Sequence, residues 1–272
     1  METRFQHSDK KVKSTLNCGP LTNLFMIDCN FINDHRSGGL ALLWNDNVNV
    51  EILNANNMYI DAYITACNMN ISWFSTGVYG NPYYSKKHLT CEVISELYQQ
   101  RYNSKWLIFG DFNLILNRSE KLGGNIIDYH HTNMFNETLN NCALNDLGYY
   151  GSKYIWANNQ SDNDHIKERL DRFCASSNWI LYFPKFSNTH LLRYTSDHNP
   201  IMLKFYTATE CYNTQSFKKI HRFEQLWAHD KDSFQIVQNA WNTMTGTSTK
   251  KLHFILDQLH NWGKDKYGHI PN

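Results

Sequence analysis

Between residues 38 and 79 the chain carries short apolar runs, each separated from the next by turn-forming residues. Residues 39–44 (GLALLW) have the composition of a buried strand, and residues 48–53 and 58–66 alternate between apolar and polar side chains. Residues 72–78 are rich in aromatic and β-branched side chains, and asparagine and glycine occupy the gaps. The pattern predicts a meander of adjacent antiparallel strands.

Helical periodicity follows in residues 89–98 and again in residues 132–144. The fully apolar run Trp106-Leu107-Ile108-Phe109 lies between them and is typical of a buried strand. Further segments have the composition of short strands (154–156, 170–174 and 200–205) or of a short helix (177–182). Strands with helices on both outer faces predict an α/β sandwich of two sheets.

The pattern of apolar and charged residues changes after about residue 207. Residues 221–241 and 251–262 have helical periodicity, charged faces and no strand signal. We therefore predict one α/β domain over residues 1–207 and a helical extension over residues 208–272.

Composition limits the classes of function. The 272 residues are 42% hydrophobic and 14% aromatic, which is enough for a full core, and the net charge of +1 provides no overall basic field. The seven cysteines form no C-x-x-C pair, so we expect reduced thiols. No apolar run resembles a signal peptide or a membrane span. These features predict a soluble protein of the nucleus or cytoplasm.

Two polar clusters adjoin apolar runs: Gly110-Asp111-Phe112-Asn113 and Ser196-Asp197-His198-Asn199-Pro200. Carboxylates bind hard cations, an imidazole acts as a base or holds a phosphate, and an amide donates to phosphate oxygens. Together they indicate metal-assisted hydrolysis of a phosphate ester. Taken alone, the first cluster is more typical of an ordinary turn, and the second is equally compatible with a turn and with a site.

Two further segments have the same ambiguity. In Arg169-Leu170-Asp171-Arg172 an inward-facing Asp171 would orient His198 through a hydrogen bond. The alternative is a salt-bridged strand end in which both arginines are solvated. Tyr79-Gly80-Asn81-Pro82 is a turn by composition, yet its phenol is also a donor to phosphate.

These four clusters occur in the order and rough spacing of the endonuclease/exonuclease/phosphatase superfamily. The chain more closely resembles the apurinic-endonuclease-like domain of plant LINE-type (non-LTR) retrotransposons, and it does so over nearly its whole length. Three further segments carry this resemblance: residues 36–44 (RSGGLALLW), 76–80 (TGVYG) and 155–159 (IWANN). The resemblance implies a DNase I-like αββα sandwich and cleavage of DNA.

The resemblance also implies roles for individual residues. Glu2 and Asp197 would hold Mg²⁺, or Mn²⁺ in its place, and Asp111 would activate the attacking water. Asn113 would hold the phosphate. His198 would stabilise the charged phosphoryl oxygen or act as a base.

Four more residues complete the implied site. Asp171 would orient the imidazole, and Tyr79 would contact the scissile phosphate. Asn81 and Trp156 would face the DNA, although a buried aromatic is an equally good interpretation of Trp156.

The chain departs from this family pattern at its amino terminus. Family members have a first strand with an Asn-x-Arg-Gly-like motif and a helix before the glutamate-bearing strand, whereas Glu2 stands at the start of this chain. We therefore expect the first strand and helix to be missing and catalysis to be impaired.

The leading hypothesis is a Mg²⁺-dependent DNA endonuclease of retrotransposon type that acts on double-stranded target DNA. Two alternatives stay open. One is a phosphatase of small phosphoesters. The other is a catalytically dead nucleic-acid-binding remnant that uses basic residues of the tail (Lys218, Lys219, Arg222, Lys250 and Lys251).

Overall fold

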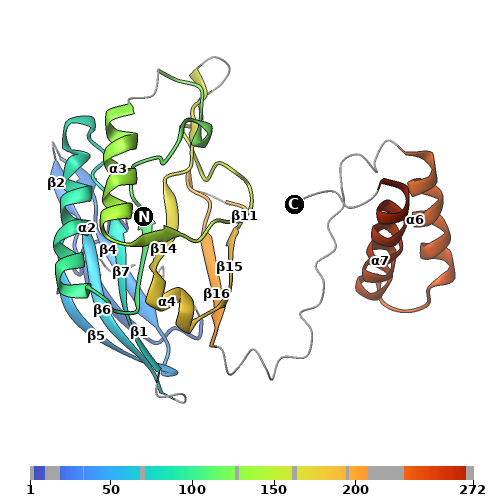
Figure 1. Cartoon of the computed structure of the whole chain (residues 1–272), viewed down its shortest axis with the longest axis horizontal. Helices are drawn as coiled ribbons and strands as arrows, with labels where there is room; N and C mark the ends of the chain where they lie inside the picture. The colour runs from blue at the N-terminus through green and yellow to red at the C-terminus, as the bar shows by residue number, and fades with distance from the viewer. Residues whose placement is uncertain are drawn as a thin grey trace. The chain divides into compact units, whose positions relative to one another are not determined.

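A six-stranded sheet forms the centre of the first part of the chain (Figure 1). The computed structural model describes residues 3–9, 19–32, 34–67, 71–125, 129–160, 164–193, 196–207 and 230–267. The sheet has the strand order β10-β14-β8-β7-β6-β5, in which β7 and β8 are parallel and the other neighbours antiparallel. Its strands are β5 (Val48–Ala55), β6 (Tyr59–Ala66), β7 (Ile71–Tyr79), β8 (Trp106–Asp111), β10 (Leu144–Asp146) and β14 (Asp171–Ser176).

The predicted meander is confirmed for β5, β6 and β7 and is wrong for the strand before them. That strand, β4 (Leu40–Trp44), pairs with β1 (Asn23–Ile27) rather than with β5. Alternation identifies a strand but does not identify its partner, and β1 had no clear signal of its own. A short hairpin of β2 (Asn30–Ile32) and β3 (His35–Ser37) connects the two.

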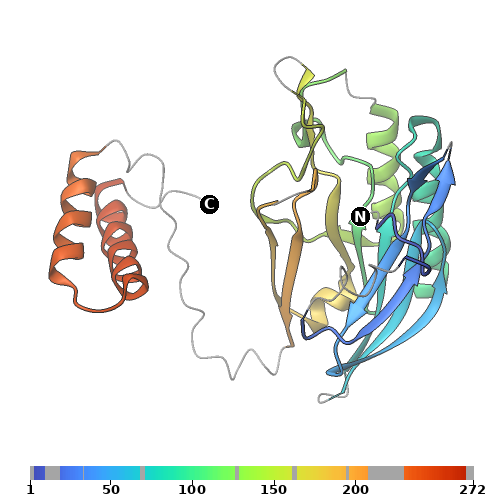
Figure 2. The same ribbon diagram turned by 180° about the vertical axis from the view of Figure 1, so that it is seen from behind.

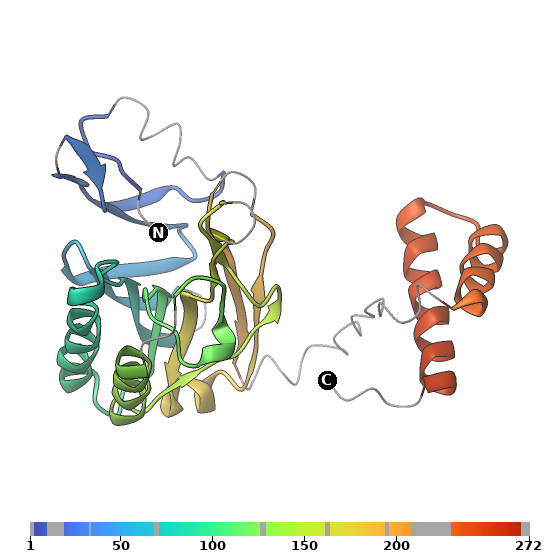
Figure 3. The same cartoon turned by 90° about the horizontal axis from the view of Figure 1, so that it is seen from above.

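Two helices cover one face of the six-stranded sheet, and helical periodicity predicted both of these helices. They are α2 (His88–Arg101) and α3 (Tyr129–Asn141), and Figure 3 shows them on the side of the sheet opposite β1 and β4. The 3-10 helix η1 (Tyr84–Lys86) precedes α2. The core between helices and sheet is closed by fully buried side chains that include Ile94, Trp106 and Phe135.

A second layer lies on the other face of the six-stranded sheet (Figure 2). One part of it is the sheet β11 (Tyr150–Gly151), β15 (Lys185–His190) and β16 (Ile201–Tyr206). Trp179 of α4 (Ser177–Tyr182) packs there against Phe205, with ring centroids 5.2 Å apart. The other part is β4, which borders an apolar cavity of about 120 Å³ against β6, β7 and β8. The two sheet layers and outer helices confirm the predicted α/β class.

Another small sheet consists of β12 (Trp156–Ala157), β13 (Lys167–Glu168) and β9 (Lys121–Leu122). The 3-10 helix η2 (Arg118–Glu120) directly precedes β9. Beside it lies a buried charge network. Arg172 is 0% exposed and donates to the carboxylates of Glu120 (3.0 Å) and Asp146 (2.9 Å). Arg169 binds the same two carboxylates at 2.8 Å and 2.7 Å. The alternative of solvated arginines is therefore wrong, because each guanidinium is buried and paired with acids.

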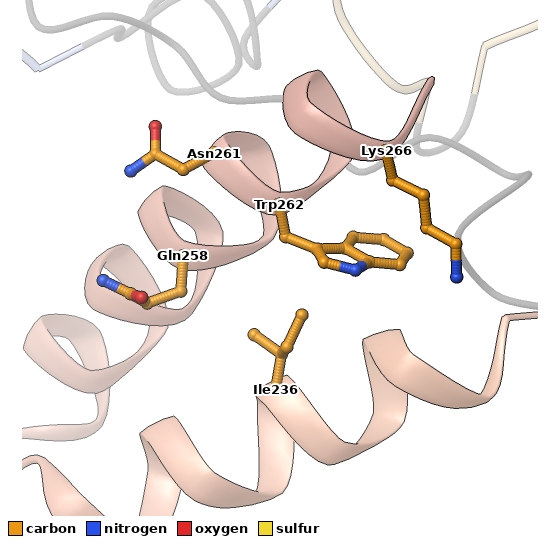
Figure 4. A pocket seen from close by; sticks show the side chains of 5 residues that line it. All are labelled: Ile236, Gln258, Asn261, Trp262 and Lys266. Atoms are coloured by element: carbon orange, nitrogen blue, oxygen red, sulfur yellow. The ribbon is translucent and has the colours of Figure 1, made fainter. Parts of the chain in front are cut away.

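The chain divides into two units, Met1–Tyr212 and Asn213–Asn272. The second contains α6 (Lys231–Thr243) and α7 (Ser248–Tyr267), which pack through Ala240, Ile255 and Leu259. This unit has a cavity of about 550 Å³. Figure 4 shows the side chains that line it, which are those of Ile236, Gln258, Asn261, Trp262 and Lys266. Lys218, Lys219 and Arg222 lie outside the described residues, as does the side chain of Lys250.

Candidate active site

Three predicted site residues lie in one row across neighbouring strands. Tyr79 at the end of β7 is the register partner of Asp111 at the end of β8, and Asp111 is the partner of Asp171 at the start of β14. Because side chains alternate along a strand, Asp111 and Asp171 share the face of Phe109 and Phe173. That face is turned toward the second sheet layer. Sheet pairing therefore brings both carboxylates to one edge of the sandwich.

Two glycines let the ends of β7 and β8 approach closely. A Cβ at Gly80 would clash with the carbonyl of Phe112, and a Cβ at Gly110 would clash with the carbonyl of Val78. Gly110 also has a φ of +128°, which side chains rarely adopt. The Gly80 N–H donates to the Asp111 carbonyl at 2.6 Å. The glycines in these clusters thus serve the close contact of two strand ends.

Asn113 is folded back onto Asp111. Its backbone N–H donates to Asp111 Oδ1 (2.8 Å), and its side-chain Nδ2 donates to Asp111 Oδ2 (3.1 Å) and to the Gly80 carbonyl (2.8 Å). The backbone φ of +53° at Asn113 lies in the left-handed region, which asparagine tolerates. Both amide hydrogens are engaged, so contact with a phosphate requires one of these bonds to be exchanged.

His198 lies between the two carboxylates. Its Nδ1 is 2.7 Å from Asp171 Oδ2, the hydrogen bond expected from the sequence, and its Nε2 is 3.9 Å from Asp111 Oδ2. A β-bridge to Trp156 fixes the backbone of His198, and the next residue donates to the Ile155 carbonyl at 2.6 Å. The carboxylate of Asp171 thus holds the ring with Nε2 directed to Asp111.

The electrostatics of the three groups are linked. Burial, and after it the negative charge of Asp171, raises the pKa of Asp111 to about 6. Burial by itself lowers the pKa of His198, but the hydrogen bond and charge of Asp171 and the charge of Asp111 raise it above its usual value. Asp111 therefore holds a proton more readily than an ordinary aspartate, and His198 is more easily protonated than an ordinary histidine.

Asp197 is exposed beside His198, and its Oδ2 accepts the indole N–H of Trp156 at 3.1 Å. Among the described residues, no group of three or more histidine, cysteine or acidic side chains is arranged to hold a metal ion. Mg²⁺ keeps several waters and needs only one or two carboxylates plus substrate phosphates. The exposed, oriented carboxylate of Asp197 fits such a site. Glu2, the other predicted ligand, lies outside the described residues.

The structure brings seven of the predicted site residues together, whereas Asn81 makes hydrogen bonds only within its own loop and to α2 in the part of the chain that the structure describes. The strand pairings and hydrogen bonds given above connect these seven residues: Tyr79, Asp111, Asn113, Asp171, His198, Asp197 and Trp156. The Oδ1 of Asn81 accepts the N–H of Tyr83 at 3.1 Å, and its own N–H donates to Thr90 Oγ1 at 2.9 Å. Asn81 thus shapes the loop between β7 and α2.

Sequence reasoning missed the acidic partners of the two arginines. Glu120 and Asp146 both bind Arg172, and the guanidinium also donates to the Leu114 carbonyl at 3.2 Å. The loop that begins at Asn113 is in this way fastened to the start of β14, which carries Asp171. The sequence carried one sign of this network: Arg169 and Arg172 flank the inward-facing Asp171 in an apolar segment, where arginines need acidic partners.

The fold is similar to that of the endonuclease domain of TRAS1, a telomere-specific non-LTR retrotransposon. The similarity covers 68% of this chain and 80% of that chain, with 13% identity and a TM-score of 0.52. The fold is DNase I-like. The chain is also similar to the human Nocturnin catalytic domain with bound sulfate (72% and 76% covered, 14% identity, TM-score 0.46). A further similar structure is D. rerio TDP2 complexed with single strand DNA product (68% and 77% covered, 17% identity, TM-score 0.44).

No protein-family model matches the sequence, and no curated protein matches it significantly. The five cysteines in the described part of the chain are free thiols. No helix in that part is long and apolar enough to cross a membrane.

Proposed function

We propose that this DNase I-like protein is a Mg²⁺-dependent phosphodiester hydrolase that cleaves DNA as an endonuclease of retrotransposon type. The observation that carries the proposal is the row Asp171–His198–Asp111, in which one imidazole lies between two buried carboxylates at a sheet edge. Hydrolysis of a phosphodiester needs a group that deprotonates water and a group that balances negative charge on the phosphoryl oxygens. These three residues supply both.

Asp111 is suited to accept the proton of the attacking water, because its pKa of about 6 is close to neutral pH. His198, held by Asp171 and readily protonated, would donate from Nε2 to a phosphoryl oxygen. Asp197 would hold Mg²⁺, and Glu2 is the second proposed ligand. When bound, the ion would neutralise charge on the phosphate. Tyr79, which lies next to Asp111 across the sheet, would contact the scissile phosphate.

The test is nicking of supercoiled plasmid DNA by the full chain with Mg²⁺, with Mn²⁺ and with EDTA. Asp171→Asn keeps the shape of the side chain but removes the charge that holds the imidazole, so we expect nicking to fall about 10²–10⁴-fold. Asp164→Asn, at an exposed aspartate, serves as the matched control and should leave nicking unchanged. Nicking that persists in EDTA or in Asp171→Asn contradicts the proposal.

Two further arms separate the alternatives. Release of phosphate from small phosphoesters without any plasmid nicking would favour a phosphatase. Salt-dependent DNA binding that survives Asp197→Ala, again without nicking, would favour a non-catalytic binding remnant. We expect the protein to act in the nucleus or cytoplasm.

A further inference from the structure

The loop that leaves the candidate site carries two exposed tyrosines. Tyr83 and Tyr84 are 54% and 63% exposed and follow Tyr79 by four and five residues. Four residues span at most about 14 Å, which is about four stacked nucleotides at 3.4 Å each. A nucleic acid strand that has its cleavable phosphate at Tyr79 and runs along this loop would therefore reach the Tyr83 ring within about four nucleotides.

The loop is held in shape by its own contacts. Asn81 accepts the Tyr83 N–H and is tied to α2 through Thr90, as described above. The ring of Tyr84 meets the ring of His131, on α3, edge to face with centroids 4.6 Å apart. Exposed aromatic rings with a supported backbone lose little freedom when a ligand stacks on them.

Positive charge accompanies the rings. The Nζ of Lys86 lies 5.9 Å from the centroid of the Tyr83 ring. Lys87 follows Lys86 directly and is half-buried, and its backbone N–H donates to the Tyr84 carbonyl at 3.4 Å. We call Tyr83, Tyr84, Lys86, Lys87 and His131 the aromatic lip.

We propose that the aromatic lip binds unpaired nucleotides next to the cleaved phosphate, so that the preferred substrate is DNA with a single-stranded or frayed stretch at that position. This inference rests on the proposed function and makes its substrate class more specific. The lysines bind backbone phosphates, and the tyrosine rings stack on exposed bases. In a closed duplex the faces of the bases are covered by their neighbours, so exposed rings add little there, whereas in an unpaired strand they are accessible.

The test measures binding of fluorescein-labelled DNA to the full chain in EDTA, by fluorescence anisotropy. The probes are a single-stranded oligonucleotide, a blunt duplex of the same sequence and a forked duplex. The variant Tyr83→Ala/Tyr84→Ala should raise the Kd for the single-stranded and forked probes at least about tenfold. For the blunt duplex we expect less than about a threefold change, since stacking contributes little to it.

Three controls sharpen the measurement. Tyr83→Phe/Tyr84→Phe keeps the rings and should bind all three probes as the unchanged chain does. Tyr102→Ala removes a tyrosine that is 72% exposed at the opposite end of α2 and should have no effect. Lys86→Ala/Lys87→Ala should lower the slope of log Kd against log salt by about 1.4 for the single strand.

Several outcomes overturn the proposal: no binding of the single strand, an equal loss for single strand and duplex in Tyr83→Ala/Tyr84→Ala, or an equal loss in Tyr102→Ala. Failure of the proposed catalytic function is a separate result. A chain that binds the single strand through the tyrosines but never nicks DNA retains the aromatic lip and loses the nuclease. If the chain nicks DNA and Tyr83→Ala/Tyr84→Ala does not change its binding to the single strand, the proposed nuclease function stands and the proposed role of the aromatic lip is refuted.

Discussion

The substitution Arg172→Met should destabilise the first unit severely. The guanidinium of Arg172 is 0% exposed and donates five hydrogen bonds, to Glu120, Asp146, Leu114 and Arg169. Methionine fills much of the space but leaves the buried carboxylate of Glu120 and the half-buried carboxylate of Asp146 with Arg169 and one backbone N–H each, those of Leu116 and Gly148. Breaking a buried ion pair by removing one partner costs about 3–5 kcal/mol. That is a large part of a domain stability of about 5–15 kcal/mol.

The assay is urea-induced unfolding of the full chain followed by circular dichroism. Arg118→Met, at an exposed arginine of η2 two residues from Glu120, is the matched control and should change stability by no more than about 0.5 kcal/mol. A cost below about 1 kcal/mol for Arg172→Met would refute the view that this network is desolvated and tightly paired.

The pH dependence of the same variant follows from the acids. Burial by itself raises the pKa of Glu120, but the charge and hydrogen bond of Arg172 lower it below its usual value. A lowered pKa in the folded state means that Glu120 contributes stability above its unfolded pKa of about 4, and that this contribution is lost as pH falls through the folded value. The difference between Arg172→Met and the unchanged chain should therefore shrink in acid.

Two more predictions concern the candidate site. Because the pKa of Asp111 is raised to about 6, its ionisation costs stability above that pH. Asp111→Asn should therefore raise the Tm at about pH 8 but not at about pH 3, where Asp111 is also largely protonated in the unfolded chain. An equal Tm of the two proteins at the higher pH contradicts the assigned burial. Trp156→Phe removes the indole donor to Asp197 Oδ2. It should raise the Mg²⁺ concentration needed for half-maximal nicking and cost no more than about 1.5 kcal/mol of stability. An unchanged Mg²⁺ requirement argues against Asp197 as a ligand.

Local patterns in the sequence predicted much of the α/β framework. Alternation located β5, β6 and β7, and helical periodicity located α2 and α3, because one face of each element is buried. The strand β15 was missed because two of its buried side chains, Asn188 and His190, are polar. A buried polar side chain depends on distant partners, and the sequence near it carries no sign of them.

The candidate site was predicted in a different way. Asp171 and His198 are 27 residues apart, so no periodicity connects them. Their hydrogen bond was expected from the inward-facing position of Asp171 in an apolar segment and from the order of several polar clusters. The deep burial of Arg172 ran against the usual preference of arginine for the surface. It became understandable only once β10 and η2 were seen to bring Asp146 and Glu120 beside it.

The candidate site forms only if three strands pair in the correct register, because Tyr79, Asp111 and Asp171 lie in one row across them. Each residue comes from a different strand, and all three face one side only in the observed register. A slip of β14 by one position would turn Asp171 to the helix-covered face and separate it from His198. Catalytic competence would then report on correct sheet assembly, so an inactive preparation with normal helix content would point to misaligned strands.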